Sequence, residues 1–146
     1  MSGLKLLALD EEDLDIVSAH MQDSVFKVAE CAFDARMKQF SLTANRFVWE
    51  TASEKGRPLE RRKAALVFKR VSAVKSTGVD RKNRQAVLDL LAIRFEKQGE
   101  GPEGVIELVL AGGGVVRLDV ECIEAQLADV GGAWETKSKP QHRVDA

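Results

Sequence analysis

The fold of this chain is decided most clearly by residues 106–120, which read IELVLAGGGVVRLDV. Apolar residues recur at every second position on both sides of the glycines, and a period of two is that of a β-strand. Pairing positions whose numbers sum to 224 keeps the apolar side chains on one face and sets Glu107 opposite Arg117, whereas a sum of 226 sets Glu107 opposite Asp119. The stretch therefore predicts a hairpin of the first register, closed by the three-residue loop Ala111–Gly113.

Working outward, the same period predicts four earlier strands, so that the chain carries six in all. The alternation slips its phase twice, near Arg46 and inside the third strand, which indicates a bulge or the end of a strand at those points. A helix competes with a strand for the fourth segment, because it is rich in Leu and Ala. The four segments span residues 26–33, 40–45, 64–74 and 86–96.

Two helices are predicted at the ends of the strand region. Asp10 is suited to cap a helix over residues 11–22, because acids fill its first turn. A second helix is expected over residues 121–130, where Ile123, Leu127 and Val130 follow helical spacing before Gly131. We expect Trp134 to fold back over the end of that second helix.

These elements predict an α+β domain built on a mainly antiparallel, six-stranded curved sheet or partly closed barrel. The N-terminal helix precedes the strands, and the C-terminal helix is expected to plug an open end. Such a strand-rich roll with a closing helix is similar to the pleckstrin-homology type of architecture, an analogy that carries no function. Residues 1–134 are expected to form the single domain, and residues 135–146 a polar, flexible tail.

Composition indicates a soluble globular protein, because 45% of the 146 residues are hydrophobic and 31% are charged. No apolar run approaches the roughly 18 residues that a membrane span needs, and the N-terminus lacks the features of a signal peptide. We therefore expect a cytoplasmic protein. Cys31 and Cys122 lack metal-ligand spacing, and Gly112–Gly114 lack the Lys of a phosphate-binding loop, so we expect no metal and no cofactor.

Charge is distributed very unevenly along the chain. Residues 55–84 hold eleven of the twenty-two Lys and Arg but only two acids, which gives this basic segment a charge of +9 and the remainder −10 for a total of −1. Such segregation bears on partners rather than on the fold. An anionic partner is one interpretation, and pairing of these cations with the acidic remainder of the same domain is the other.

The candidate binding residues come from the basic segment and from one aromatic patch beside a phase slip. The patch, residues 45–50, reads NRFVWE and would suit recognition if Phe47 or Trp49 is exposed, but the scarcity of aromatic residues in the chain favours the alternative that both rings fill the core. We select Arg46, Trp49, Arg57, Arg61, Arg62, Lys63, Lys69 and Arg70. No residue is selected as catalytic.

Three functions are compatible with these features. The first is a non-enzymatic interaction module that uses the basic surface to bind an acidic protein or a second copy of the chain. The second is an enzyme or small-ligand protein with a pocket between the sheet and the C-terminal helix. Nucleic-acid binding comes third, because the basic segment has Phe68 as its one aromatic residue and the alternation assigns Phe68 to the core.

Five segments together resemble an uncharacterised family of short alphaproteobacterial proteins known as a domain of unknown function. The resemblance covers residues 4–134 and implies a bacterial cytoplasmic setting, but it carries over no functional residue. The segments are LKLLALD at 4–10 with Asp13-Leu14, SAHMQD at 18–23, NRFVWE at 45–50, LAIRF at 91–95 and VECIEA at 120–125.

Overall fold

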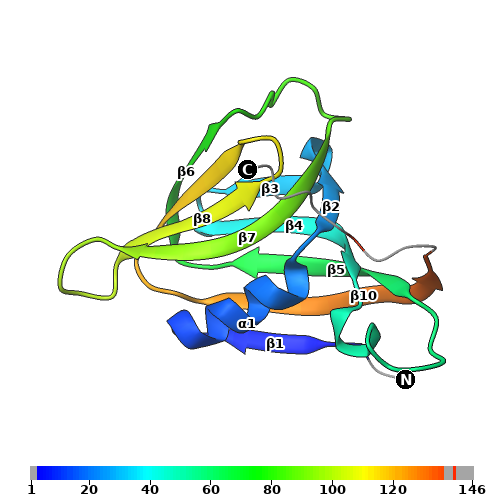
Figure 1. Ribbon diagram of the computed structural model, residues 1–146. Helices are drawn as coiled ribbons and strands as arrows, with labels where there is room; N and C mark the ends of the chain where they lie inside the picture. Colours follow the sequence, from blue (N-terminus) through cyan, green and yellow to red (C-terminus); the bar gives the residue numbers. More distant parts are fainter. Residues whose placement is uncertain (1–2, 137–139, 141–146) are drawn as a thin grey trace, which may run out of the picture.

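A computed structural model describes residues 3–136 and residue 140. In this part of the chain, ten strands form a single antiparallel sheet, and one α-helix packs beside it (Figure 1). The α-helix, α1, spans Glu11–Met21, and two 3-10 turns, η1 and η2, span Val28–Glu30 and Trp49–Thr51. The strands are β1 (Lys5–Ala8), β2 (Ser24–Lys27), β3 (Cys31–Asp34), β4 (Gln39–Phe47), β5 (Glu60–Phe68), β6 (Val71–Thr77), β7 (Val87–Lys97), β8 (Gly104–Leu110), β9 (Val115–Val120) and β10 (Ala125–Glu135).

The strands form two groups that meet at one point. Their order is β1-β10-β5-β4-β2-β7-β8-β9-β6, with β3 added to β4. The junction between β4 and β2 consists of the single residue pair Val25 and Asn45. Among the described residues the sheet is not closed, because β6, at the end opposite β1, pairs there with β9 alone.

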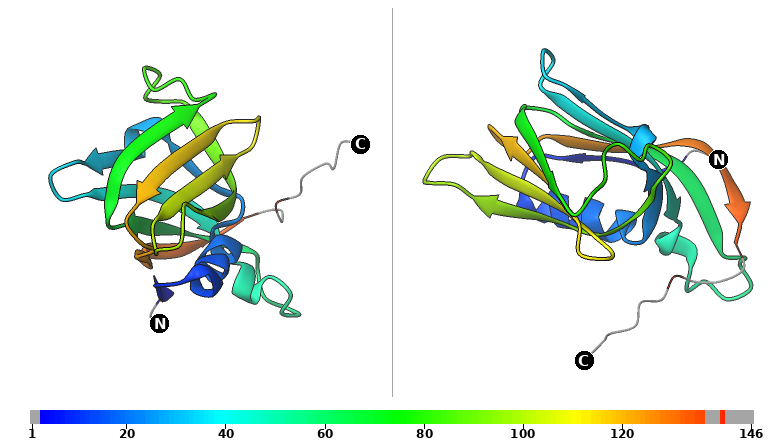
Figure 2. Two further views of the ribbon diagram at one scale, coloured as in Figure 1. Left: turned by 90° about the vertical axis from the view of Figure 1, so that its left-hand side faces the viewer. Right: turned by 90° about the horizontal axis from the view of Figure 1, so that it is seen from above.

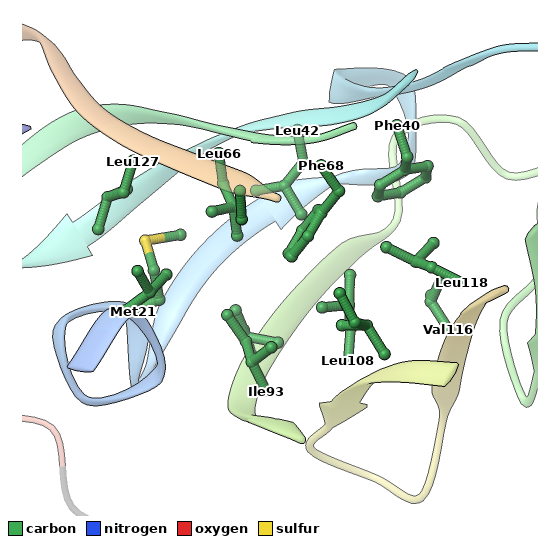
Figure 3. Packing of buried hydrophobic residues seen from close by; sticks show 14 of the residues in the cluster. Met21, Phe40, Leu42, Leu66, Phe68, Ile93, Leu108, Val116, Leu118 and Leu127 are labelled. Atoms are coloured by element: carbon green, nitrogen blue, oxygen red, sulfur yellow. The ribbon is translucent and has the colours of Figure 1, made fainter. Parts of the chain in front are cut away.

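Apolar side chains from both groups of strands face one another and form one core. Leu42, Leu66 and Leu127 come from the first group, and Ile93 and Leu108 come from the second; all are at most 2% exposed (Figure 3). Burial of this many large side chains is the main stabilising contribution to a domain of this size.

Helix α1 forms where it was predicted, and its packing explains its place in the fold. The Asp10 side chain accepts a hydrogen bond of 2.8 Å from the Asp13 N–H, which satisfies one of the free donors of the first turn. Leu14, Val17 and Met21 are buried at helical spacing. The helix lies alongside β1 and packs against β7 (Figure 1), where the Ser18 hydroxyl oxygen accepts a 2.8 Å hydrogen bond from the Ile93 N–H.

The predicted hairpin has the expected register. Glu107 lies opposite Arg117 and Ile106 opposite Leu118, and the Arg117 Nε lies 3.3 Å from a Glu107 carboxylate oxygen. The Leu110 N–H donates to the Gly114 carbonyl across the loop. Gly112 and Gly113 have φ of 87° and 95°, values that favour glycine, which explains why the loop needs them.

The predicted fold class is wrong in its strand count and in its second helix. No helix follows α1 other than the two 3-10 turns in the part of the chain that the structure describes, and residues 125–135 form β10. Ile123, Ala125 and Leu127 are buried at a spacing of two, a pattern that also contains two of the three positions used to predict the helix. Because β10 forms ladders with both β1 and β5, backbone pairing outweighs the local helical preference.

Because the predicted C-terminal helix is absent from the described residues, the predictions that depended on it are also wrong. Trp134 does not cover a helix end: it lies in β10 opposite Arg61 and is 42% exposed. The analogy to the pleckstrin-homology architecture fails, and the described residues contain no C-terminal helix that could form a pocket with the sheet. Residues 137–139 and 141–146 of the predicted tail lie outside the described residues.

The four strands beyond the predicted six have simple origins. Two predicted strands are each divided: residues 26–33 by η1, and residues 64–74 by a turn at Lys69 and Arg70, whose φ is 61°. The slip of phase inside residues 64–74 therefore marks the end of one strand and the start of the next, which is one of the two predicted alternatives. Strand β1 was not predicted, and β10 replaces the expected helix. The fourth predicted strand is β7, so the competing helix is wrong there.

Candidate functional site

Arg46 does not lie at the surface. It continues the buried phase of β4 after Phe40, Leu42 and Ala44, and it is 0% exposed. The strand keeps its period of two at this point, so the core-facing position is occupied by an arginine rather than displaced by a bulge. An arginine in such a place needs partners for its charge and its donors.

Two carboxylates supply those partners. Arg46 Nε lies 2.7 Å from Asp129 Oδ1 and Nη2 lies 2.8 Å from Oδ2, while Glu50 accepts from Nη1 at 2.9 Å and from Nη2 at 2.8 Å. The Leu4 N–H also donates to Asp129 Oδ2, at 2.7 Å. We call Arg46, Glu50 and Asp129 the buried ion cluster, after its two buried members; the Glu50 side chain lies at its edge and is 34% exposed. The cluster ties β4, β10, η2 and the segment before β1 to one another.

The pKa shifts in this cluster follow from its geometry. Burial of Asp129 raises the pKa of its carboxyl group, but the hydrogen bonds from Arg46 and from the Leu4 N–H outweigh burial, and the pKa is lowered overall. The pKa of Glu50 is lowered in the same way, against burial, chiefly by Arg46. Burial acts to lower the pKa of Arg46, yet its two carboxylates raise it. All three groups are therefore held in their charged forms.

The aromatic residues of the predicted patch are also used inside the fold. Phe47 is 0% exposed, and its ring meets the Trp49 ring edge-on with centroids 4.6 Å apart. The half-buried Trp49 donates from Nε1 to the Gln22 carbonyl at 2.8 Å. The guanidinium of Arg61 lies 5.9 Å from the centre of the Phe47 ring. Through these contacts the patch joins the end of α1 to β4 and β5.

Arg61 serves mainly to bind the backbone where the two groups of strands meet. Its Nη1 donates to the carbonyls of Asp23 and Asn45, at 3.2 and 3.1 Å. Burial lowers the pKa of Arg61, while the charges of Asp89 and Asp23 oppose that change. Like Arg46, it faces acids of its own chain.

The remaining selected residues are spread over two areas. Arg57 lies in the exposed loop before β5, 3.4 Å from Glu54 and 3.7 Å from Glu60. Half-buried Arg62 and exposed Lys63 follow on β5. At the far end of β5, Lys69 and Arg70 border a shallow depression, and Arg70 Nε lies 3.5 Å from Glu124. The structure therefore does not gather the eight residues into one site.

A pocket lies instead between the β3–β4 hairpin and β6, where the sheet fails to close. We call it the β3–β6 pocket; both views of Figure 2 show the hairpin and β6 on the same side of the molecule. Its volume is about 200 Å³. Apolar side chains make up most of its lining, with Ser76, Arg81 and Arg84 as the polar groups; the others are Val28, Cys31, Phe40, Val74, Val79, Leu88 and Val116.

The loop between β6 and β7 carries the two arginines and is anchored at both ends. Near β6, Gly78 packs so closely on the β8–β9 turn that a Cβ added to it would lie 3.1 Å from the Gly114 Cα, and its φ is 71°. Near β7, the N–H groups of Val28 and Ala29 donate to the carbonyls of Ala86 and Arg84, at 3.1 and 2.9 Å. The loop is therefore held against the pocket from two sides.

The charges at this pocket differ from those of the buried ion cluster. Arg81, Lys82 and Arg84 are exposed, and none of them takes part in an ion pair with any other residue that the structure describes. Asp80, the one acid of the loop, uses its side chain to accept from the Lys82 backbone N–H at 3.1 Å. The pocket therefore combines an apolar interior with a cationic rim.

Cys31 contributes a thiol to the lining of the pocket. Burial, with Glu30 nearby, raises the pKa of the Cys31 thiol to about 11, so the thiol is protonated at neutral pH and is a poor nucleophile. Among residues 3–136 and 140, no group of three or more His, Cys, Asp or Glu side chains could hold a metal ion. No helix in the same residues is long and apolar enough to cross a membrane.

Sequence reasoning missed this pocket because its lining comes from five separate strands, the 3-10 turn η1 and the β6–β7 loop. Arg81 and Arg84 belong to the predicted basic segment, but nothing in their spacing distinguishes them from its nine other cations. One available signal was the short apolar Val79 inside an otherwise polar connection.

Residues 4–142 match the model of the family described as "Protein of unknown function (DUF2948)", and the chain belongs to this family. No curated protein and no solved structure matches the chain.

Proposed function

We propose that this protein is a non-enzymatic binding module that takes an acidic segment of a partner protein at the β3–β6 pocket. The observation that carries the proposal is the position of Arg81 and Arg84 on the rim of an apolar pocket, with no ion pair to the residues that the structure describes. The site keeps the basic segment 55–84 as the source of the binding charge, but it moves within that segment to the β6–β7 loop.

The size of the pocket supports one inserted side chain. A core cavity of about 150 Å³ holds a benzene ring. The β3–β6 pocket, at about 200 Å³, therefore accommodates one large apolar or aromatic side chain and not a larger cofactor. A buried anchor surrounded by charged contacts is the usual arrangement of an interface in which a few residues supply most of the affinity.

The charge of the rim supports an acidic partner. Two guanidinium groups offer planar, bidentate donors to carboxylates, and the loop presents a third cation in Lys82. Self-association is a less suitable form of this proposal, because several acids near the basic segment are already engaged, as in the pairs Arg70–Glu124 and Lys38–Glu121. The bacterial, and specifically alphaproteobacterial, cytoplasmic setting expected from the sequence belongs to the same proposal.

The test is a selection of random heptapeptides displayed on phage against the full chain. We expect enrichment of peptides that combine two or more acids with one large apolar residue. The affinity of the most enriched peptide, measured by fluorescence anisotropy, should fall at least tenfold in an Arg81→Glu/Arg84→Glu variant. A Lys55→Glu/Arg94→Glu variant makes the same charge change at exposed positions away from the pocket, and we expect it to bind within twofold of the native chain.

Other outcomes would overturn the proposal. Absence of any enriched peptide, or enrichment of basic peptides, would contradict an acidic partner. A twelve-nucleotide oligothymidylate that binds more tightly than the peptide, and loses its binding in the same Arg81→Glu/Arg84→Glu variant, would replace the proposal by nucleic-acid binding.

A further inference from the structure

The free edge of β6 borders the β3–β6 pocket. β6 is the last strand of the sheet and pairs with β9 alone, while β3 pairs with β4 alone, as far as the described residues show. The Val71 N–H donates to the Lys38 carbonyl at 2.9 Å, which ties the start of β6 to the start of β4. Beyond this contact the two strands do not pair, and the pocket occupies the space between the β3–β4 hairpin and β6.

This edge is regular beside the pocket. The irregularity in the pairing of β6 with β9 falls between Val71 and Ala73, and from Val74 to Thr77 the partners follow one another without a break. Four such residues extend for about 13 Å at roughly 3.3 Å per residue. A regular edge strand presents unpaired backbone donors and acceptors, which suit the addition of another strand.

Side chains of β6 and of the following loop are placed to contact the side chains of an added strand. Val74 and Ser76 are two residues apart and both line the pocket, as expected for one face of a strand. Arg81 and Arg84 lie on the rim. A strand added beside β6 would send every second side chain toward the same pocket, and an acidic residue next to the paired portion would meet the two guanidinium groups.

We infer that the partner binds as an extended acidic segment that adds to the free edge of β6 and inserts one apolar side chain into the β3–β6 pocket. In this mode the partner's backbone supplies hydrogen bonds and its alternate side chains supply specificity. The inference rests on the proposed function, because it describes how the same site holds its partner.

The test uses N-methylation of the most enriched heptapeptide, one amide at a time. An added strand turns alternate N–H groups toward its neighbour, so methylation should lower the affinity at least tenfold at every second position of the paired portion and less than threefold at the positions between. In a parallel measurement by NMR, the peptide should slow the hydrogen exchange of amides in Val74–Thr77 and leave those of Lys5–Ala8, on the opposite edge strand, unchanged.

The two proposals fail in different ways. If N-methylation has the same effect at every position, or if exchange in β6 is unchanged while binding still depends on Arg81 and Arg84, the added strand is wrong and the binding module stands. If the selection yields no peptide whose affinity depends on the two arginines, the proposed function fails and the added strand fails with it.

Discussion

The buried ion cluster and the β3–β6 pocket use arginine in opposite ways. Arg46 is 0% exposed and meets Asp129 and Glu50 through four hydrogen bonds of at most 2.9 Å. Arg81 and Arg84 are exposed, beside an apolar pocket, and form no ion pair with residues that the structure describes. The cost of removing a charge from water explains the difference: a buried guanidinium must be matched inside the fold, whereas an exposed one is available to a partner.

The contrast between the two regions shows that a run of basic residues in the sequence need not form one basic binding surface. Part of the basic segment is occupied within the domain, since Arg57, Arg61 and Arg70 contact acids or carbonyl groups of their own chain. The β6–β7 loop is a part of the segment whose exposed cations lack such contacts among the described residues. Charge in the sequence therefore overstates the surface available for binding.

The largest effect is expected from breaking the buried ion cluster. An Arg46→Met substitution leaves Asp129, whose side chain is 1% exposed, as a buried charge without its main partner, and should lower the free energy of unfolding by about 3–5 kcal/mol. Urea denaturation followed by circular dichroism measures this loss. Adding Asp129→Leu to Arg46→Met should recover more than half of it, because an apolar pair needs no compensation of charge; a double variant no more stable than the single one would contradict this explanation.

The two regions should also differ in how they affect the pH dependence of the unfolding free energy. The folded-state pKa values of Asp129 and Glu50 lie below their ordinary values near 4, so their stabilising contribution is complete above about pH 5 and is lost as pH falls through the folded values. We expect the unfolding free energy to fall between about pH 5 and pH 2, more steeply in the native chain than in the Arg46→Met/Asp129→Leu variant. An Arg81→Gln/Arg84→Gln variant should keep the native slope, and equal slopes in all three proteins would show that the cluster has no part in it.

The smallest effect is expected for an exposed pair. Arg117 Nε lies 3.3 Å from Glu107 across the β8–β9 hairpin, and both side chains are partly exposed. Glu107→Lys should cost about 0.2–1 kcal/mol, since it replaces an exposed attractive pair by a repulsive one. The exchanged variant Glu107→Lys/Arg117→Glu should restore the native stability in urea denaturation; a loss as large as that of Arg46→Met would contradict the contrast between buried and exposed ions.

Local patterns predicted those elements in which neighbouring residues supply the structural information. Helix α1 followed from Asp10 and the acids after it, and the β8–β9 register followed from Glu107, Arg117 and the glycines between the strands. Residues 121–130 were wrongly predicted as a helix because Ile123 and Leu127 satisfy both a helical and a strand period, and only pairing with β1 and β5 decides between them. The slip of phase inside residues 64–74 left a bulge and a strand end both open, because each shifts the alternation, and only the structure shows that β5 ends at Phe68 and β6 begins at Val71.

The amino-acid sequence by itself determined that most of the chain forms antiparallel strands, and it also determined the first helix, the register of one hairpin and the concentration of cations in residues 55–84. Tertiary structure decided which of the chain's cations are paired inside the fold, as when Arg46 meets Asp129 from a strand 83 positions away. It also decided where the sheet stays open, and thus where a pocket forms. The physical reason is that periodicity and caps depend on neighbours in the chain, whereas burial, ion pairing and pocket shape depend on residues that only folding brings together.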